Sequence, residues 1–374
     1  MPKYKGVYPD GDAYMATASR GSGANRVQWK QRGFATAAEA AVARSDILAT
    51  MAEGSFVPSS DLTLARYLTE WLDGLAVAGL RPSTIASYRR VVNKWHIPHL
   101  GPIRLQDLNA HAIDALYATM AATVKLRTVR FAHSVLRKAL QDAVRKKLRR
   151  TNPADDASPP KVSSTRAPER TVWTPAQLRA FLAEQTDSYY FPVWHLAGFT
   201  GMRRAELCGL TWDAVDLDGA ALYVHRTLTT VEGVPTWGDV KTGRSRRRIA
   251  LDPGTVAMLR RHRAAQAKQR LMFGAGWTDS GCVFTGPTGA PLHPDSVGQA
   301  FERVAVAKAG RPRLTLHGLR HSHCTHLLVA GVDVKTVSER MGHASVAFTL
   351  DTYGHVMPGS QEAAAAAVAA LVAG

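Results

Sequence analysis

Chemically capable side chains gather in short motifs in the second half of the chain. In order, the motifs are TGMRRAEL at 200–207, VKTGRSRRRIAL at 240–251, LHGLRHSHCTHLL at 316–328 and MGHASVAFTLDTYGHV at 341–356. Taken singly, each has an ordinary structural explanation, such as a capped helix, a solvated basic hairpin or a tyrosine in a helix core. What they do together depends on the side chains they supply.

The first motif predicts a turn that leads into a short helix. Gly201 permits the tight turn, and Arg203 then falls in the first helical turn, where a helix N-terminus already favours anions. Arg204 is the adjacent alternative. Glu206 lies on the same helix and is a candidate to orient the arginine.

The second motif is dense in positive charge. Five basic residues fall within eight positions, and a β-prone run follows. We expect a hairpin with Lys241 near its tip, where a mobile ammonium group would reach a phosphate. Arg244 and Arg247 are predicted DNA contacts, and a merely solvated basic hairpin is the alternative.

The third motif carries several histidines around one arginine. His317 and Arg320 are three residues apart, so they share a face of the predicted helix. His321, His323 and His326 suggest a metal site, but the HExxH pattern is absent and no carboxylate flanks them. We therefore expect no metal here, and expect some of these histidines simply to pack or to cap.

The last motif adds His343 and Tyr353, and the combined set can attack a phosphodiester without a metal. Arginine forks match phosphate oxygens in a bidentate manner and neutralise transition-state charge. Tyrosine can serve as a covalent nucleophile, but its pKa of roughly 10 calls for a base or an electropositive pocket. Lysine can protonate a departing oxygen, and histidine can shuttle a proton.

The elements that must position these residues form three segments. Residues 4–34 alternate β-prone runs with turn signals and predict a three-stranded antiparallel sheet, followed by a helix over 36–52. We treat 1–56 as one domain whose basic side chains could lie in a nucleic-acid groove. Its candidate contacts are basic residues that a solvated sheet face would explain equally well: Lys5, Arg20, Arg26 and Lys30.

Residues 57–150 predict a domain of four helices. The fourth, from about Leu126 to Lys147, is rich in arginine and lysine, which favours phosphate contact over a merely exposed charged face. The predicted DNA contacts in this domain are Arg81, Ser83, Thr84, Arg89, Arg127, Arg130 and Lys138.

A linker is predicted over 151–170, because proline, serine and charge replace any apolar period there. Residues 171–374 then predict a mixed, mostly helical domain. Its expected helices lie near 175–185, 188–199, 203–210, 254–271, 294–309, 318–330, 333–341, 345–352 and 360–372, and its expected short strands near 220–230, 245–251 and 282–285. The predicted fold class is mainly α, multidomain, with two small sheets (α+β).

Composition narrows the class of protein. The formal net charge is +17 and the pI about 10.1, and residues 57–160 alone carry 16 basic and 8 acidic side chains. A chain this basic indicates a nucleic-acid partner, with a plain solubility bias as the alternative. Three scattered cysteines exclude a disulfide framework and suit a reducing cytoplasm. No signal peptide and no run of 18 apolar residues is found, so no membrane association is expected.

As an ordered set, these motifs resemble the catalytic domain of the tyrosine recombinases, specifically the integrases of phages and integrative elements. The resemblance extends over most of the chain. Residues 57–150, with LRPSTIASYRR and the NPA that follows the last helix, resemble the helical core-binding domain, and residues 1–56 resemble the small arm-binding domain of many integrases.

The resemblance implies a role for each matching residue. Tyr353 would become linked to the 3′ phosphate and leave a free 5′ hydroxyl. The remaining catalytic set would be Arg203 and Arg320 on the scissile phosphate, Lys241 as general acid, His317 and His343 in proton handling, and Glu206 as support. Met341 and Ala344 stand where the family often has leucine and serine, but neither change removes a catalytic group.

The resemblance also implies what the protein works with. It implies exchange of strands between double-stranded attachment sites by a homotetramer on two duplexes, in the cytoplasm and at the nucleoid. It implies no cofactor, and no Walker motif is present. A directionality factor or a host DNA-bending protein is a candidate partner. A dimer resolvase or a topoisomerase of the same chemistry, or a decayed DNA-binding regulator, is the alternative.

Overall fold

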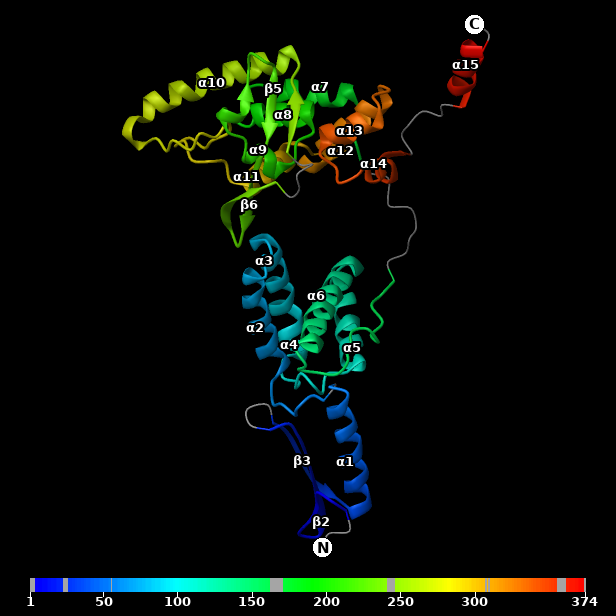
Figure 1. Ribbon diagram of the computed structural model, residues 1–374. Coiled ribbons are helices and arrows are strands. Elements are labelled where there is room, and N and C mark those ends of the chain that lie inside the picture. Colours follow the sequence, from blue (N-terminus) through cyan, green and yellow to red (C-terminus); the bar gives the residue numbers. More distant parts are fainter. Residues whose placement is uncertain are drawn as a thin grey trace. The chain divides into compact units, whose positions relative to one another are not determined.

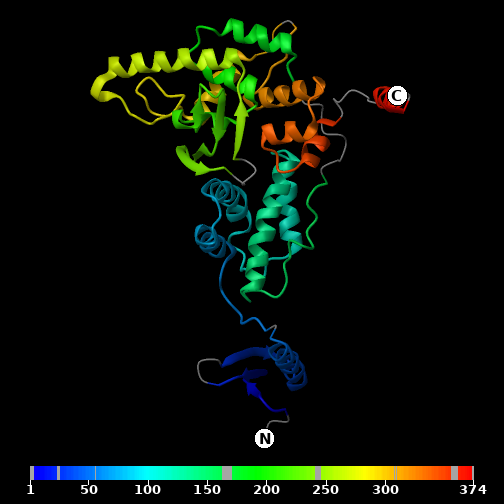
Figure 2. The same cartoon turned by 45° about the horizontal axis from the view of Figure 1, so that its top comes forward.

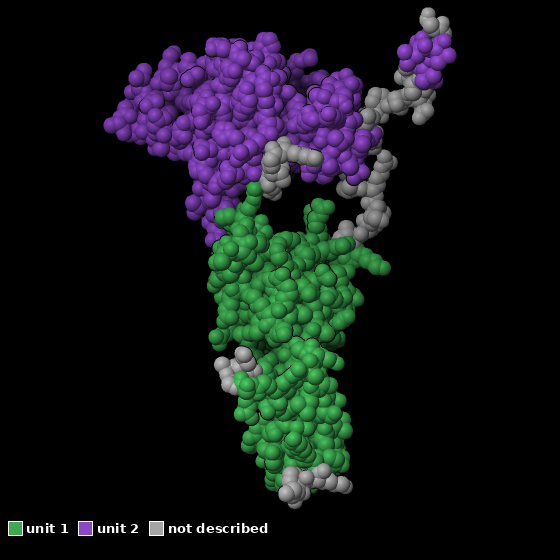
Figure 3. All heavy atoms as spheres, in the orientation of Figure 1, with its two compact units in different colours: residues 1–164 green, residues 165–374 purple. Residues whose placement is uncertain are grey.

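The computed structural model describes residues 4–22, 26–54, 56–161, 171–240, 246–306, 308, 310–354 and 361–372. The chain divides into two compact units, residues 1–164 and 165–374 (Figure 3). Helices dominate both units, and small antiparallel sheets accompany them, so the predicted mainly helical fold class is confirmed (Figure 1). No helix in the described ranges is long and apolar enough to cross a bilayer.

The first unit begins with a three-stranded antiparallel sheet in the order β1-β2-β3. Its strands are β1 Val7–Asp10, β2 Ala13–Arg20 and β3 Val27–Phe34, and α1 Ala37–Ala52 follows. Thr36 caps α1 by accepting a hydrogen bond from the backbone N–H of Glu39 at 3.2 Å. Val7, Ala16 and Ala40 form a small core between the sheet and the helix that the sequence predicts here.

The helical part of the first unit has its own, larger core. Its helices are α2 Leu64–Val77, α3 Pro82–Val91, α4 Ile97–Leu100, α5 Ala110–Ala121 and α6 Leu126–Arg145, with a π-helical turn over Val92–His96 joining α3 to α4. The four helices predicted over 60–150 are therefore present, the second of them running through that π-helical turn. In α6, apolar residues at helical spacing face the core and leave the basic residues on the opposite face.

The linker predicted over 151–170 is wrong in its first half. Residues 151–161 pack onto the helices: Ala154 and Ala157 are buried in their core, and the Asn152 side chain donates to the carbonyl of Arg137 at 3.1 Å. Proline and serine suggested a linker, but Asn152 and Asp155 bond to Arg137 within α6, and the backbone N–H of Ser158 donates to Asp114 of α5. Residues 162–170 lie outside the described part of the chain.

The second unit surrounds a core of aromatic rings that includes Trp173, Phe181, Trp194 and Phe301. Its helices are α7 Pro175–Glu184, α8 Phe191–Thr200, α9 Arg204–Cys208, α10 Pro253–Phe273, α11 Pro294–Val304, α12 Leu316–Val329, α13 Val334–Met341, α14 Val346–Tyr353 and α15 Gln361–Val372, with 3-10 turns at Trp212–Ala214 and Gly274–Gly276. Helices α12, α13 and α14 lie side by side (Figure 1; Figure 2).

Two small antiparallel sheets complete the second unit. One has the order β4-β5-β8 and the other is the hairpin β6-β7, formed by the strands β4 Val215–Asp216, β5 Ala221–Val224, β6 Arg226–Val231, β7 Val234–Asp239 and β8 Arg247–Ala250. The strand expected at 282–285 is wrong, because only isolated bridges occur there. Strand β7 was not predicted.

The hairpin expected around Lys241 is also wrong. The strands on either side of that residue do not pair with each other: β7 pairs with β6, and β8 pairs with β5. Strands β7 and β8 therefore belong to different sheets. Lys241 and Arg244 themselves lie outside the described residues.

Candidate active site

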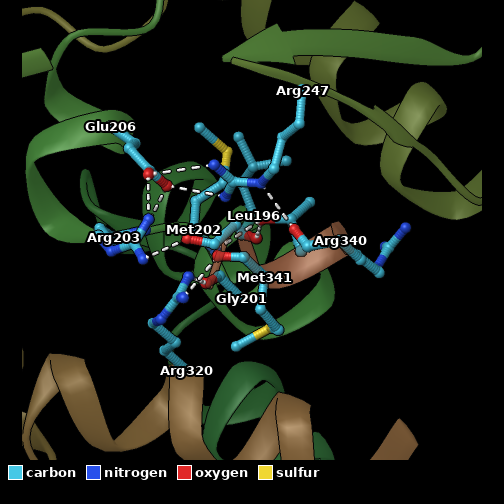
Figure 4. Close-up of polar contacts among 11 residues, drawn as sticks. Leu196, Gly201, Met202, Arg203, Glu206, Arg247, Arg320, Arg340 and Met341 are labelled. Atoms are coloured by element: carbon cyan, nitrogen blue, oxygen red, sulfur yellow. Dashed lines mark hydrogen bonds and ion pairs between the residues drawn. The ribbon is translucent and has the colours of Figure 1, made fainter. Parts of the chain in front are cut away.

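The first motif forms a tight turn between α8 and α9. Gly201 adopts φ 64°, and a Cβ there would come within 2.7 Å of the His323 ring and 2.9 Å of the Met341 sulfur. The turn brings Arg203 to the N-cap of α9, where its backbone N–H donates to Glu206 Oε2 at 2.9 Å. Its guanidinium donates to Glu206 Oε1 at 2.7 Å, so Glu206 holds both ends of Arg203 (Figure 4).

Glu206 lies between two guanidinium groups. Arg247 on β8 donates to it in a bidentate manner, at 3.1 Å to Oε1 and 2.9 Å to Oε2. Burial by itself raises the pKa of this carboxyl, but the hydrogen bonds and charge of Arg247 and the charge of Arg203 outweigh it and lower the pKa to about 2. The carboxylate is therefore ionised at any ordinary pH.

Arg247 requires a correction to the sequence prediction. Its side chain is only 6% exposed, so it serves inside the unit and does not present a surface contact to DNA. Its Nε donates to the Arg340 carbonyl at 2.7 Å, which ties β8 to the end of α13. Gly342, with φ 61°, packs against it: a Cβ there would lie 2.9 Å from Arg247 Nη1.

Arg203 and Arg320 converge on the segment that joins α13 to α14. Arg203 Nη2 donates to the Gly342 carbonyl at 2.7 Å, and Arg320 Nη2 donates to the Met341 carbonyl at 2.5 Å. Arg320 Nη1 also donates to the Gly201 carbonyl at 2.6 Å, which joins α12 to the first turn (Figure 4). Burial, followed by the charge of Arg203, lowers the pKa of Arg320 to about 9.

Tyr353 lies at the end of α14 and is only 3% exposed. Its ring stacks on His343, with centroids 6.2 Å apart and planes within 9°. Its hydroxyl lies 2.5 Å from His321 Nδ1. Motifs that are 150 residues apart in the sequence therefore meet in one place.

The pKa of His343 shows that the surroundings of Tyr353 are positively charged. Its Nδ1 lies 2.8 Å from the hydroxyl of Thr349. Burial, then the charges of Arg320, Arg203 and Arg247, lowers its pKa to about 3. Because the same imidazole stacks on Tyr353, the phenol also lies in the field of these guanidinium groups. Such a field favours a phenolate and attracts a phosphate.

The remaining histidines of α12 divide by role. His317 is exposed, and its ring lies 4.7 Å from that of His321 at 87°. His323 and His326 contact backbone carbonyls, Gly198 at 3.0 Å and Trp173 at 2.7 Å, as the packing interpretation expects. No cluster of three potential metal ligands occurs in the described ranges.

Two residues of this site escaped the sequence interpretation. The sequence predicts Arg247 to be a surface contact. Its place in a β-prone run, two residues before the apolar Ile249, was a signal that its side chain could be buried and paired. His321 was grouped with the packing histidines of its motif. Its place directly after Arg320 was the available signal.

The predicted contacts on the helices of the first unit lie mostly at the surface. Arg127, Arg130 and Lys138 are exposed on α6, and the Lys138 ammonium stands 5.6 Å above the Tyr88 ring. In α3, Arg89 is half-buried and forms an ion pair with Asp73 at 3.4 Å.

The predicted contacts at the start of α3 and on the N-terminal sheet are exposed or half-buried. Arg81 is exposed at the start of α3, with Ser83 and Thr84 half-buried behind it. On and beside the sheet, Lys5, Arg20, Arg26 and Lys30 are exposed. Arg20 also donates to the carbonyl of Met51 at the end of α1.

Known proteins resemble the chain along most of its length. Residues 174–359 match the phage integrase family, and residues 63–120 match the SAM-like N-terminal domain of phage integrases. An integrase of Streptomyces ambofaciens is 29% identical over 346 residues, which cover 91% of this chain and 88% of that protein. A XerC-like tyrosine recombinase of Caldanaerobacter subterraneus is 25% identical, covering 86% of this chain and 87% of its own.

Two solved structures share the fold. The Tn1549 transposon integrase in complex with transposon right end DNA superposes with a TM-score of 0.66 at 20% identity, over 84% of this chain and 100% of that one. A lambda integrase tetramer bound to a Holliday junction superposes with a TM-score of 0.56 at 18% identity, over 92% of this chain and 94% of that one.

Proposed function

The chain is a tyrosine recombinase of the phage integrase family, and we propose that Tyr353 is the nucleophile with which it breaks and rejoins DNA. Its activity is site-specific recombination by an integrase. One observation carries the assignment of roles. Arg203 and Arg320 donate to the carbonyls of Gly342 and Met341. The charges of both arginines lower the pKa of His343, whose ring stacks on Tyr353.

In the proposed step, Tyr353 Oη attacks the scissile phosphorus. The bond from phosphorus to the 5′ oxygen breaks, and the 3′ phosphate stays on the tyrosine. Arg203 and Arg320 bind the nonbridging oxygens and neutralise charge that develops in the transition state. The phosphotyrosyl bond conserves the energy of the broken phosphodiester, so rejoining needs no cofactor.

Three further residues complete the proposed chemistry. Lys241 protonates the departing 5′ oxygen, a role that rests on the family resemblance alone. His343 stays neutral, because its pKa is about 3, and it can donate or accept a hydrogen bond at the phosphate without adding charge. His317, exposed on α12, binds the phosphate or handles protons at the open side of the site.

Burial sets a condition on this mechanism. Tyr353 is 3% exposed and Arg320 is 4% exposed, so α14 has to shift before a phosphate can reach both. Helix α14 is short, and its Phe348 and Leu350 are 47% and 46% exposed, so its displacement would cost little buried apolar surface. We propose that DNA binding shifts α14 enough to admit a phosphate while Tyr353 Oη stays within hydrogen-bond reach of His321.

The partners follow from the same proposal. Double-stranded DNA would contact residues 1–56 at arm sites and residues 57–150 at the crossover core, while residues 171–374 cleave. The lambda integrase tetramer on a Holliday junction supports a homotetramer on two duplexes. Val368, Leu371 and Val372 of α15 are exposed and apolar, which supports docking on a neighbouring subunit or on the same one. A directionality factor or a DNA-bending protein would assist.

A nicked suicide duplex tests the nucleophile. After incubation, denaturing electrophoresis should show a covalent adduct between protein and DNA for the natural chain and none for Tyr353→Phe. An adduct that persists in that variant would disprove the assignment. Footprinting on the attachment DNA tests the integrase role: protection confined to the crossover core, with no arm sites, would favour a dimer resolvase.

A further inference from the structure

His321 is the imidazole that contacts the hydroxyl of Tyr353. It lies on α12 directly after Arg320, and its Nδ1 stands 2.5 Å from the tyrosine oxygen. The two ring centroids are 5.7 Å apart and tilted by 47°, so the contact is an edge hydrogen bond and not a stack. We propose that His321 is a catalytic residue that takes the hydroxyl proton of Tyr353 as its oxygen attacks phosphorus. This inference rests on the proposed function, in which Tyr353 is the nucleophile.

A proton acceptor is needed at this position. With a pKa of roughly 10, a free phenol is ionised in only about a thousandth of molecules at neutral pH. Burial of Tyr353 works further against the phenolate. A base within hydrogen-bond distance removes this obstacle, because the proton leaves while the new bond forms.

The other groups around Tyr353 are poorly suited to that task. His343 stacks face to face on the ring, and its pKa of about 3 makes it a weak base. The Cys324 thiol forms a hydrogen bond with Tyr353, but burial raises the pKa of the thiol to about 11, so it already holds its proton. His321 combines the right atom with the right distance.

His317 extends the arrangement toward solvent. It lies one helical turn before His321, and their rings meet edge to face at 4.7 Å. His317 is exposed whereas His321 is half-buried, so a proton held on His321 has an exposed imidazole beside it. The path therefore runs from Tyr353 to His321 and on past His317.

The proposed step balances in both directions. On cleavage, the proton of Tyr353 moves to His321 Nδ1, the tyrosine oxygen bonds to phosphorus, and the 5′ oxygen leaves with a proton from the general acid. On rejoining, the 5′ hydroxyl attacks, and His321 returns its proton to the departing tyrosine oxygen. His321 variants should therefore slow both half-reactions.

The test measures single-turnover adduct formation on the nicked suicide duplex. His321→Asn keeps a hydrogen-bonding atom near the position of Nδ1 but cannot take a proton, and we expect its rate to fall about 10²–10⁴-fold. His321→Ala should fall as far and recover with added imidazole, faster with more basic substituted imidazoles. His326→Gln, on the same helix, keeps a group near the Trp173 carbonyl and should cleave at close to the natural rate.

The possible results distinguish the role of His321 from the assignment of Tyr353 as nucleophile. A His321→Asn rate within about tenfold of the natural chain would overturn proton transfer, as would a slow His321→Ala that binds DNA and melts normally but gains nothing from imidazole. Failure of the natural chain itself to form an adduct would instead overturn the nucleophile assignment. Thermal melting and DNA binding of each variant exclude simple misfolding.

Discussion

The arginines of the candidate site and those exposed on α6 are used in opposite ways. In the second unit, Arg247 and Arg320 are almost fully buried, and carbonyl or carboxylate oxygens of the protein fix their N–H groups. In the first unit, Arg127 and Arg130 extend from α6 into solvent. A fixed guanidinium costs no reorganisation when charge develops on a substrate, whereas an exposed one follows a phosphate backbone and exchanges it for counterions. Burial alone does not mark a catalytic arginine, since Arg149 of the first unit is also buried and donates to the Leu105 and Leu108 carbonyls.

The largest expected effect is on the free energy of unfolding, and it comes from removing the charge of the Glu206 carboxylate. Glu206→Gln leaves Arg203 and Arg247 buried or half-buried without a carboxylate, and we expect a loss of about 3–5 kcal/mol in the free energy of unfolding. Chemical denaturation measures it. The matched control is Glu70→Gln, which breaks the exposed Arg66 pair and should cost about 0–1 kcal/mol. Equal losses would remove the distinction between the two regions.

Arg320→Ala tests the fixed arginines in catalysis. Loss of one preorganised donor should slow adduct formation about 10²–10³-fold, with DNA affinity little changed. Arg320→Lys should fail to rescue, because one ammonium cannot reproduce the fork that spans the Gly201 and Met341 carbonyls. Single-turnover cleavage and a binding isotherm on the same duplex measure both quantities. A variant that binds weakly but cleaves at the natural rate once saturated would contradict the comparison.

A smaller effect should appear with pH. Burial lowers the pKa of His323 to about 3, against 6.5 when unfolded. The unfolded chain therefore takes up the proton first, and stability is lost as pH falls from about 6.5 toward 3. His323→Asn keeps a donor for the Gly198 carbonyl and should flatten this decline. Melting temperatures at a series of pH values test it, at about 2–4 °C per kcal/mol. An unchanged slope in the variant would assign the decline to other groups.

The smallest effect should come from single exposed arginines. Arg130→Ala should weaken DNA binding modestly at every sequence and reduce the slope of log affinity against log salt by about 0.9, because one phosphate contact is lost. Arg137→Ala, on the same helix, is the control: that residue is already paired with Asp155 at 2.6 Å and should change the slope less. If Arg130→Ala leaves the slope unaltered, α6 does not track the backbone.

Most helices could be predicted because local signals govern them, although α11, expected to reach 309, ends at Val304. Thr36 and Asn109 cap their helices as side-chain chemistry requires, and the apolar period of α6 matches its buried face. The hairpin around Lys241 failed because β7 already pairs with the preceding strand β6, and β8 pairs with β5, a partner distant in the sequence that composition does not encode. The first half of the linker failed for a similar reason: Ala154 is buried in the core of the helices, and Asn152 bonds to Arg137 in the middle of α6.

The residue types of the candidate site could be predicted, but the contacts between its side chains could not. Order and spacing indicated Arg203, Arg320, His343 and Tyr353, and the structure brings them together. The pairing of Arg247 with Glu206 and the contact of His321 with Tyr353 depend on the directions of the side chains in three dimensions. Neighbouring residues of a motif can therefore face opposite surroundings, as exposed His317 and buried Arg320 do.

The internal pairing of Glu206 has one last consequence. The guanidinium groups of Arg203 and Arg247 share the Glu206 carboxylate, and the charge of Arg320 acts close to theirs, so these four groups together carry net positive charge. A ground-state phosphodiester brings one negative charge, whereas the five-coordinate phosphorane brings about two. The positive charge of the arginines therefore lies where negative charge accumulates on the oxygens bound to phosphorus. A trigonal-bipyramidal oxyanion such as vanadate, held between the tyrosine and a 5′ hydroxyl, should therefore bind here more tightly than a ground-state phosphodiester.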